Sequence, residues 1–179
     1  ERHKFYDALQ EAGENISELL RQNPALAEII NPIPYKRGRM GKDVYGTHKK
    51  QVERLEWAKR INPEAALKAT SWGQFQIMGF NHKLAGFDDV FSFVDAMQTH
   101  EGQVKAFVSF IKNSKLDDEL QRKDWAGFAK GYNGKNYRGD PSTVEDDYDW
   151  KLSRAYQRFI AQEEPKKPLA KSKTAVIAT

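Results

Sequence analysis

Apolar residues recur at helical intervals along most of this 179-residue chain. A spacing of three or four residues places such side chains on one face of an α-helix, where they form a buried stripe. Four stripes of this kind are present: Phe5, Tyr6 and Leu9; Val52, Leu55, Ala58 and Ile61; Val104, Phe107, Val108 and Ile111; and Tyr148, Leu152, Ala155, Tyr156 and Phe159. We predict a helix at each stripe, with the stripe residues facing the core.

Capping signals indicate where several helices begin. Asn62-Pro63-Glu64 and Asn23-Pro24 each combine a capping amide with a proline suited to the first helical turn. Ser142-Thr143-Val144-Glu145 has the spacing of a capping box, and Asp124 is placed to cap a further helix. No stretch alternates apolar and polar residues as a half-buried strand does. The predicted fold class is therefore all-α.

Loop and linker signals divide the chain into one domain and a tail. Residues 31–47 hold two prolines and three glycines, which predicts a long loop or a short hairpin. Residues 163–174 are rich in Glu, Lys, Pro and Ser, which is typical of a linker. We therefore expect a single globular domain over residues 1–162, long enough for a full core, and a linker or tail over residues 163–179.

The segment from Ser71 to Asn81 has an unusual mixture of side chains. Hydroxyl, amide, indole, thioether and aromatic groups stand beside two glycines within eleven residues. Such a mixture suits the wall of a cleft that binds a sugar, because a sugar has a hydrogen-bonding rim and apolar C–H faces. A buried turn between a helix and a loop, with its polar groups satisfied, would explain the same residues.

Composition excludes several kinds of chemistry. The chain has no cysteine, so disulfides and thiol catalysis are excluded, and its four histidines lack metal-ligand spacing. We therefore predict no metal and no cofactor. No apolar run is long enough to cross a membrane, and we predict no stable membrane insertion of this segment.

The basic charge favours an anionic partner. The net charge is +4, and the basic residues lie in dispersed clusters, one of them Lys36-Arg37-Gly38-Arg39. Weak attraction to an anionic polymer and an ordinary solvated surface are both compatible with this distribution. Nucleic acid is not an expected partner, because no helix combines a basic face with base-reading residues.

Four motifs follow one another in a fixed order. They are Glu1-Arg2-His3-Lys4-Phe5 at the start, the segment from Ser71 to Asn81, Trp-Ala-Gly-Phe-Ala-Lys-Gly-Tyr-Asn-Gly over residues 125–134, and Tyr-Asp-Trp-Lys-Leu over residues 148–152. This order resembles the superfamily of goose-type lysozymes and lytic transglycosylases. The full sequences of these motifs resemble those of the N-acetylmuramidase domain of modular phage endolysins, and the resemblance covers roughly residues 1–160.

The resemblance implies a fold, an activity and a set of residues. It implies a lysozyme-like domain that cleaves the β-1,4 bond between N-acetylmuramic acid and N-acetylglucosamine in peptidoglycan. It places Glu1 as the general acid. The residues that it implies for substrate binding, with Tyr45 added from the basic loop, are Ser71, Trp72, Gln74, Gln76, Met78, Tyr132, Asn133 and Tyr45.

Several roles stay open from the sequence. Trp72 either stacks on a sugar or fills the core, and Tyr132 either places its hydroxyl near the acid or is a buried structural residue. The candidate second acids Asp149, Asp124 and Glu53 are each also explained as a cap, an ion-pair member or a solvated charge. On a helix His3 would point about 200° away from Glu1, which makes it a weak direct partner.

The expected biological setting follows from the resemblance. A monomer made in the bacterial cytoplasm would act on the glycan strands of the cell wall and cause lysis. The alternatives are a lytic transglycosylase that gives anhydro-muramic products and a wall-binding module without activity. Because Glu1 starts a helical stripe without a cap before it, we also expect the natural chain to extend upstream.

Overall fold

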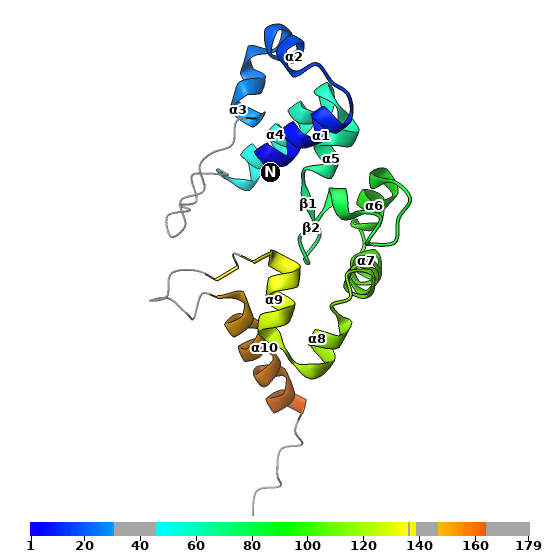
Figure 1. The fold of residues 1–179 in the computed structure, drawn as a ribbon, viewed down its shortest axis with the longest axis vertical. Coiled ribbons are helices and arrows are strands. Elements are labelled where there is room, and N and C mark those ends of the chain that lie inside the picture. The colour runs from blue at the N-terminus through cyan, green and yellow to red at the C-terminus, as the bar shows by residue number, and fades with distance from the viewer. Residues whose placement is uncertain (31–45, 136, 139–146, 164–179) are drawn as a thin grey trace, which may run out of the picture.

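The structure is a computed structural model that describes residues 1–30, 46–135, 137–138 and 147–163. Within these residues it contains ten α-helices, two 3-10 helices and one two-stranded sheet (Figure 1). The predicted all-α fold class is confirmed. Most of the predicted loop, including Tyr45, and the Ser142–Glu145 capping box lie outside the described residues, so those predictions stay as they are. The boundary between domain and tail also stays a prediction.

The first half of the chain packs around its own apolar core. Its elements are α1 (Arg2–Glu11), α2 (Ile16–Gln22), η1 (Pro24–Leu26), α3 (Ala27–Ile30), α4 (His48–Ile61) and α5 (Pro63–Lys68). The side chains buried between them include Phe5, Leu9, Leu26, Ile30, Ala58 and Ala66. The stripe of α1 therefore faces the core as predicted.

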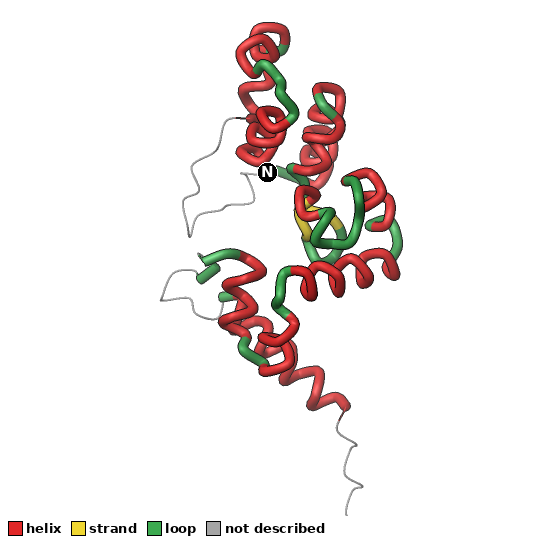
Figure 2. The backbone as a smooth tube through the Cα atoms, turned by 45° about the vertical axis from the view of Figure 1, so that its right-hand side comes forward, coloured by secondary structure: helices red, strands yellow, loops and turns green. Residues whose placement is uncertain are grey.

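The second half forms another core, beginning at the end of α5. Its elements are β1 (Ser71–Trp72), β2 (Ile77–Met78), η2 (Gly79–Asn81), α6 (Val90–Ala96), α7 (His100–Asn113), α8 (Asp117–Arg122), α9 (Trp125–Asn133) and α10 (Tyr148–Glu163). Its largest fully buried side chains are Phe93, Phe128 and Val90. Figures 1 and 2 both show the two strands between the first group of helices and the pair α9 and α10.

Two predicted helix starts are confirmed by their capping hydrogen bonds. The side chain of Asn62 accepts from the Ala65 amide at 2.9 Å, and Asp124 accepts from the Gly127 amide at 2.9 Å. These bonds satisfy amides that the first turn of a helix leaves unpaired. Asn62 also donates to the Glu14 carboxylate at 2.9 Å, which fastens the turn after α1 to the junction of α4 and α5.

The sheet was not predicted, and it lies inside the unusual segment from Ser71 to Asn81. Its two antiparallel strands pair Ser71 with Met78 and Trp72 with Ile77. Strands of two residues are too short to show the alternation by which a strand is recognised. We refer to residues 71–78 as the hairpin.

The predicted buried stripe of α7 holds for Phe107 and Ile111 but is wrong for Val104 and Val108. Val104 and Val108 are 38% and 44% exposed, whereas Ala106, Phe110 and Ile111 are buried. Ala106 and Phe110 are four residues apart and share a face, and this face, beside that of the two valines, packs on the core. None of the helices in the described ranges has both the length and the apolar character of a membrane span.

The backbone around the hairpin is packed closely, which gives a first prediction. A Cβ atom on Gly79 would collide with the backbone carbonyl of Leu67, whereas one on Gly131 would meet the end of the flexible Leu116 side chain. Gly79→Ala should therefore lower the free energy of unfolding by about 1–3 kcal/mol. Gly131→Ala should cost less, since Leu116 can move and alanine favours the helix. Urea unfolding followed by circular dichroism measures both, and equal costs would contradict the packing described.

Candidate functional site

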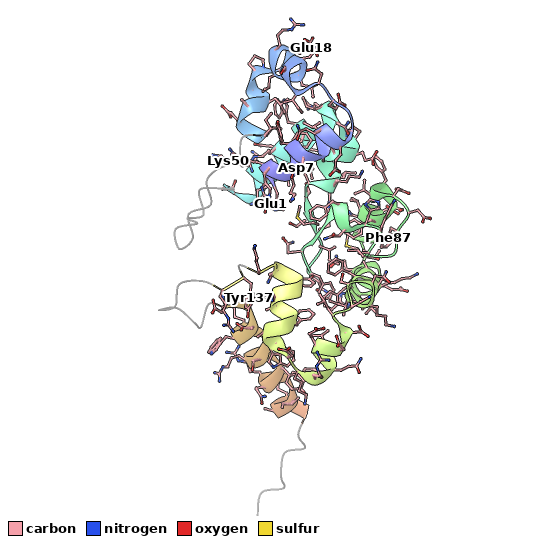
Figure 3. The ribbon with its side chains drawn as sticks, viewed as in Figure 1. Glu1, Asp7, Glu18, Lys50, Phe87 and Tyr137 are labelled. Atoms are coloured by element: carbon pink, nitrogen blue, oxygen red, sulfur yellow. The ribbon has the colours of Figure 1, made fainter. Side chains whose placement is uncertain are left out.

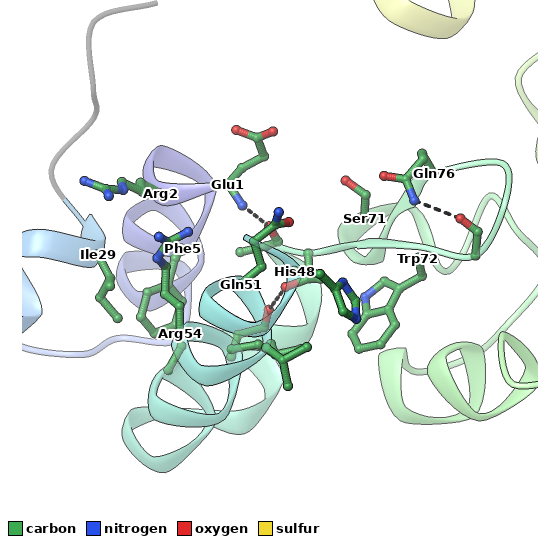
Figure 4. Close-up of a pocket in the computed structure, with 17 residues that line it drawn as sticks. Glu1, Arg2, Phe5, Ile29, His48, Gln51, Arg54, Ser71, Trp72 and Gln76 are labelled. Carbon is green, nitrogen blue, oxygen red and sulfur yellow. Dashed lines mark hydrogen bonds between the residues drawn. The ribbon is translucent and has the colours of Figure 1, made fainter. Parts of the chain in front are cut away.

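A cleft of about 630 Å³ lies where α1, α4, α5 and the hairpin meet (Figure 4). This volume falls in the range of small-molecule sites. Its lining residues come from segments far apart in the chain: Glu1, Arg2, Phe5, Ile29, His48, Gln51, Val52, Arg54, Leu55, Ala58, Ala66, Ala69, Thr70, Ser71, Trp72, Gly73 and Gln76. Four of the predicted site residues are among them, namely Glu1, Ser71, Trp72 and Gln76.

Glu1 stands at the start of α1, on the edge of the cleft. Its backbone nitrogen donates to the carbonyl oxygen of Ala69 at 2.6 Å, just before the hairpin begins. Its side chain makes no capping bond to α1 and is 35% exposed. The Nδ1 atom of His3 lies 4.0 Å from the Glu1 carboxylate. The expectation that His3 points away is therefore wrong, because Glu1 precedes α1 and is not bound by helical geometry.

Glu1 is the only carboxylic acid among the described residues that line the cleft. The other candidate acids are engaged elsewhere. Asp124 caps α9, and Glu53 lies 3.9 Å from Lys49 on the surface of α4. Asp149 accepts from Tyr137 and Arg138, both at 3.0 Å, at the end of the molecule that holds α10 (Figure 3). The described geometry therefore brings no second acid beside Glu1.

The hairpin supplies the polar wall of the cleft. Figure 4 shows the Ser71 hydroxyl and the Gln76 amide on the same side as the Glu1 carboxylate, while Trp72 points to the opposite side. The opposite directions of Ser71 and Trp72 follow from the alternation of side chains along a strand, whereas Gln76 lies in the turn. The Ser71 hydroxyl donates to the Met78 sulfur at 3.2 Å, and the Trp72 indole donates to the Leu67 carbonyl at 3.0 Å. Trp72 thus lines the cleft and also packs against the second core.

A side chain from α7 holds the turn of the hairpin. The Oε1 atom of Gln103 accepts from the Gln74 amide at 3.0 Å, and its Nε2 atom donates to the Met97 carbonyl at 2.8 Å. Within the turn, Gln76 donates to the Gly73 carbonyl at 2.8 Å. Both Gly73 and Gln76 have positive φ angles, 68° and 55°. The turn therefore has two residues in the sparsely populated region of positive φ, and the side chain of Gln103 in α7 helps to stabilise it. Gln103 was not predicted, because nothing in the sequence relates it to Gln74.

Tyr132 supports the next residue of the same turn. Its hydroxyl donates to the Phe75 carbonyl at 2.7 Å. Its ring packs among four aromatic side chains at centroid distances of 5.3 to 6.2 Å: Phe107, Phe110, Phe128 and Tyr148. Burial, with a smaller contribution from Tyr148, raises the pKa of Tyr132 above its ordinary value. The hydroxyl therefore keeps its proton and remains a donor.

Four other predicted residues do not line this cleft in the structure. Tyr132 binds the hairpin at the Phe75 carbonyl, which is not part of the cleft lining, and Asn133 is exposed at the end of α9. Gln74 is exposed with its amide bound to Gln103, and Met78 accepts from Ser71. Their roles in substrate binding remain predictions.

Helix α4 forms a wall that the sequence did not predict. His48, Gln51, Val52 and Arg54 line the cleft, and Val52 is 43% exposed rather than buried as predicted. One sequence feature could have indicated this wall. His48 and Gln51 precede the apolar stripe of α4 at helical intervals of three or four residues, so they lie on the same face of the helix. The residues described here contain no group of three or more potential metal ligands.

Comparison with known proteins identifies the family. A family model described as N-acetylmuramidase matches residues 1–160. The chain is also similar to the crystal structure of the Burkholderia AP3 phage endolysin, with 40% sequence identity and a TM-score of 0.64. That similarity covers 89% of this chain and 55% of the endolysin, so the chain spans about half of its length. No curated protein matches.

The chain belongs to the N-acetylmuramidase family. The match to the family model covers nearly the whole chain, including all four motifs from Glu1 to Leu152. The resemblance inferred from those motifs is thereby confirmed.

The support of the turn by Gln103 can be tested directly. Gln103→Leu removes the acceptor for the Gln74 amide, so hydrogen exchange at that amide should become faster, and the free energy of unfolding should fall by about 1 kcal/mol. Gln98→Leu is a matched control, because Gln98 also donates to a backbone carbonyl, that of Val94 at 3.2 Å. Exchange measured by NMR decides the matter. Equal exchange rates at Gln74 in the two variants would contradict the assignment.

Proposed function

We propose that this domain hydrolyses peptidoglycan by cutting the β-1,4 bond between N-acetylmuramic acid and N-acetylglucosamine. The observation that carries the proposal is the position of Glu1. It is the only carboxylic acid among the described residues that line the cleft, and the polar wall presents Ser71 and Gln76 on the same side. Family membership and the similarity to a phage endolysin support it. The expected consequence is lysis of the bacterial cell wall.

Glu1 would act as the general acid. Breaking a glycosidic bond requires a proton on the leaving oxygen, and a positioned carboxylic acid supplies it. Since no second carboxylate accompanies Glu1 among the described lining residues, the nucleophile would be a water molecule or the N-acetyl group of the substrate itself. Either route needs the sugar to be held firmly against the acid.

The hairpin would hold the sugar. We propose that Ser71 and Gln76 bind hydroxyl or acetamido groups at the rim of the ring. Trp72, which points to the other side of the hairpin, would support it from the second core. Tyr132 would act as a positioning residue, because its hydroxyl fixes the Phe75 carbonyl within the same hairpin. The domain would work as a monomer, made in the bacterial cytoplasm and acting on the wall.

Substitution of the acid is the central test. Glu1→Gln keeps the shape of the side chain and removes its proton, so lysis of purified peptidoglycan should fall by ~10²- to 10⁴-fold. Glu53→Gln is a suitable control, since it neutralises an exposed carboxylate outside the cleft. The circular dichroism spectrum should be unchanged in both variants. Lysis by Glu1→Gln at the wild-type rate would remove Glu1 from the mechanism.

The products distinguish hydrolysis from lytic transglycosylation. A hydrolase leaves a reducing muramic acid end, whereas a transglycosylase uses the muramic 6-hydroxyl and gives an anhydro product that is lighter by one water. We expect the reducing product. Mass spectrometry of the digest with a reducing-end assay measures this, and a digest of anhydro ends alone would establish the alternative.

Tyr132→Phe tests the positioning role. Loss of its hydroxyl leaves the Phe75 carbonyl without that donor, which should lower the free energy of unfolding by about 1 kcal/mol. If the hairpin must be held for catalysis, kcat should fall more than KM rises. A reduced stability with unchanged kcat would mean that Tyr132 serves the fold alone.

A further inference from the structure

Helix α4 contributes a side of the cleft to which the proposed mechanism gives no role. Four of its residues line the cleft at intervals of three, four and seven, which places them on one face of the helix: His48, Gln51, Val52 and Leu55. In Figure 4 Gln51 and His48 lie between Glu1 and Trp72. The hairpin and this face of α4 line the same cleft of about 630 Å³, so a sugar bound at the hairpin has its substituents within reach of α4.

The apolar part of this face is exposed where burial would be expected. Val52 has the spacing of the stripe by which α4 packs on the first core, yet 43% of it is exposed at the cleft. Leu55, almost one helical turn further on, is partly buried against that core. Covering an exposed apolar group with a ligand methyl group is favourable, because both are removed from water. A single exposed valine offers enough area for a methyl group rather than for a large apolar ring.

The polar part of this face is an amide. The Nε2 atom of Gln51 donates to the Gly46 carbonyl at 3.4 Å, which restrains the side chain. Gln51 is exposed, and within the described part of the chain no group donates a hydrogen bond to its Oε1 atom. Such an oxygen accepts from the N–H of a second amide. Since Gln51 and Val52 both line the cleft, they suit a ligand group that combines an amide with a methyl group.

The four residues of this face include no Lys, Arg, Asp or Glu, although α4 is rich in charge. The helix keeps most of its charged side chains outside the cleft lining: Lys49, Lys50, Glu53, Glu56, Lys59 and Arg60. Arg54 does line the cleft, but it already has an interaction within the molecule, and the ligand is assigned no contact with it. A neutral group therefore suits this face better than an ion, which would lose its hydration there without gaining a charged partner.

We propose that this face of α4 is a subsite for a methyl group attached to a secondary amide, with Val52 as the methyl contact and Gln51 as the acceptor of the amide N–H. The inference rests on the proposed function and names the substituent of the glycan that α4 recognises. In peptidoglycan this chemistry has two sources. One is the 2-acetamido group of the sugars, and the other is the peptide joined through the lactyl group of muramic acid.

The test uses four soluble glycan strands prepared from one batch of peptidoglycan. The first keeps its peptides, and the second is stripped of them by an amidase. The third and fourth are stripped strands that are de-N-acetylated and then acylated again, one with acetyl groups and the other with formyl groups. The last two strands have the same handling and the same amide, and they differ only in the methyl group.

The wild-type protein should distinguish the acetylated strand from the formylated one. KM should be about three- to fourfold higher on the formylated strand, which is the effect on affinity of losing one buried methyl group. The value of kcat should change little, because the formamido group keeps the amide oxygen. If the peptide is the source, KM instead rises by a similar factor when the peptides are removed, and the last two strands have equal KM values.

Substitution of Val52 assigns the methyl contact. Val52→Ser should raise KM on the preferred strand and bring the ratio of the two KM values close to one. Val108→Ser is a matched control, because Val108 is 44% exposed on α7 and lies outside the cleft lining. It should keep the wild-type ratio. A merely structural effect of Val52→Ser would change stability or kcat without removing the preference for the methyl group.

Substitution of Gln51 assigns the amide contact. Gln51→Leu should raise KM about two- to tenfold on the acetylated and formylated strands alike, since both carry the amide, and should keep their ratio. Gln10→Leu is the control, because Gln10 is exposed on α1 outside the cleft lining. It should leave both KM values as they are in the wild-type protein.

The subsite and the proposed function fail in different ways. The subsite is overturned if the wild-type protein has the same KM on all four strands, if Val52→Ser keeps the wild-type ratio, or if Gln51→Leu keeps the wild-type KM. If circular dichroism shows that Val52→Ser does not fold, Val52→Thr, which keeps the branched shape, replaces it in the same comparison. If the wild-type protein cuts none of the strands, the proposed function is wrong. Calorimetric binding to the same strands then tests the subsite by itself, and equal affinity for all four would overturn it.

Discussion

The hydrogen bond from the Glu1 nitrogen to the Ala69 carbonyl joins two parts of the chain that are 68 residues apart. It fixes the start of α1 next to the residue that precedes the hairpin. The candidate acid and the polar wall are therefore held in a fixed position relative to each other. Ala69 belongs to the same apolar core as α1, whereas Trp72 and Ile77 of the hairpin pack in the second core. The bond therefore holds the candidate acid at the place where the chain passes from the first core to the second. A catalytic group displaced by about 1 Å can lose much of its effect.

The hairpin is equally dependent on neighbours. It has four strand residues and could not stand alone. Gln103 binds one backbone group of its turn and Tyr132 binds the next, while the ring of Phe75 stacks on Phe107 at 4.1 Å. Helices α7 and α9 thus stabilise the hairpin, which is too short to be stable by itself. Their own residues reach the cleft only through this element.

The sequence allowed most of the helices to be predicted, but only part of the candidate site. Local signals were sufficient for α4 and α5, where an apolar stripe and the Asn62 cap coincide. They were not sufficient for the hairpin, because two-residue strands carry no pattern. The motifs led to Glu1 and Ser71, but the wall of α4 arises from tertiary packing. Val52 illustrates the limit: its spacing is that of a core residue, and only the cleft beside it explains its exposure.

Gln76 shows what such a site requires of the rest of the molecule. A residue with a β-carbon at φ 55° is held in a conformation that costs on the order of 1–2 kcal/mol compared with glycine. Its bond to Gly73 offsets part of that cost while its amide stays at the cleft. Glycine at this position would relax the backbone and remove the amide. Selection for thermal resistance and selection for activity would therefore pull this position in opposite directions, and its amino acid in a variant indicates which of the two prevailed.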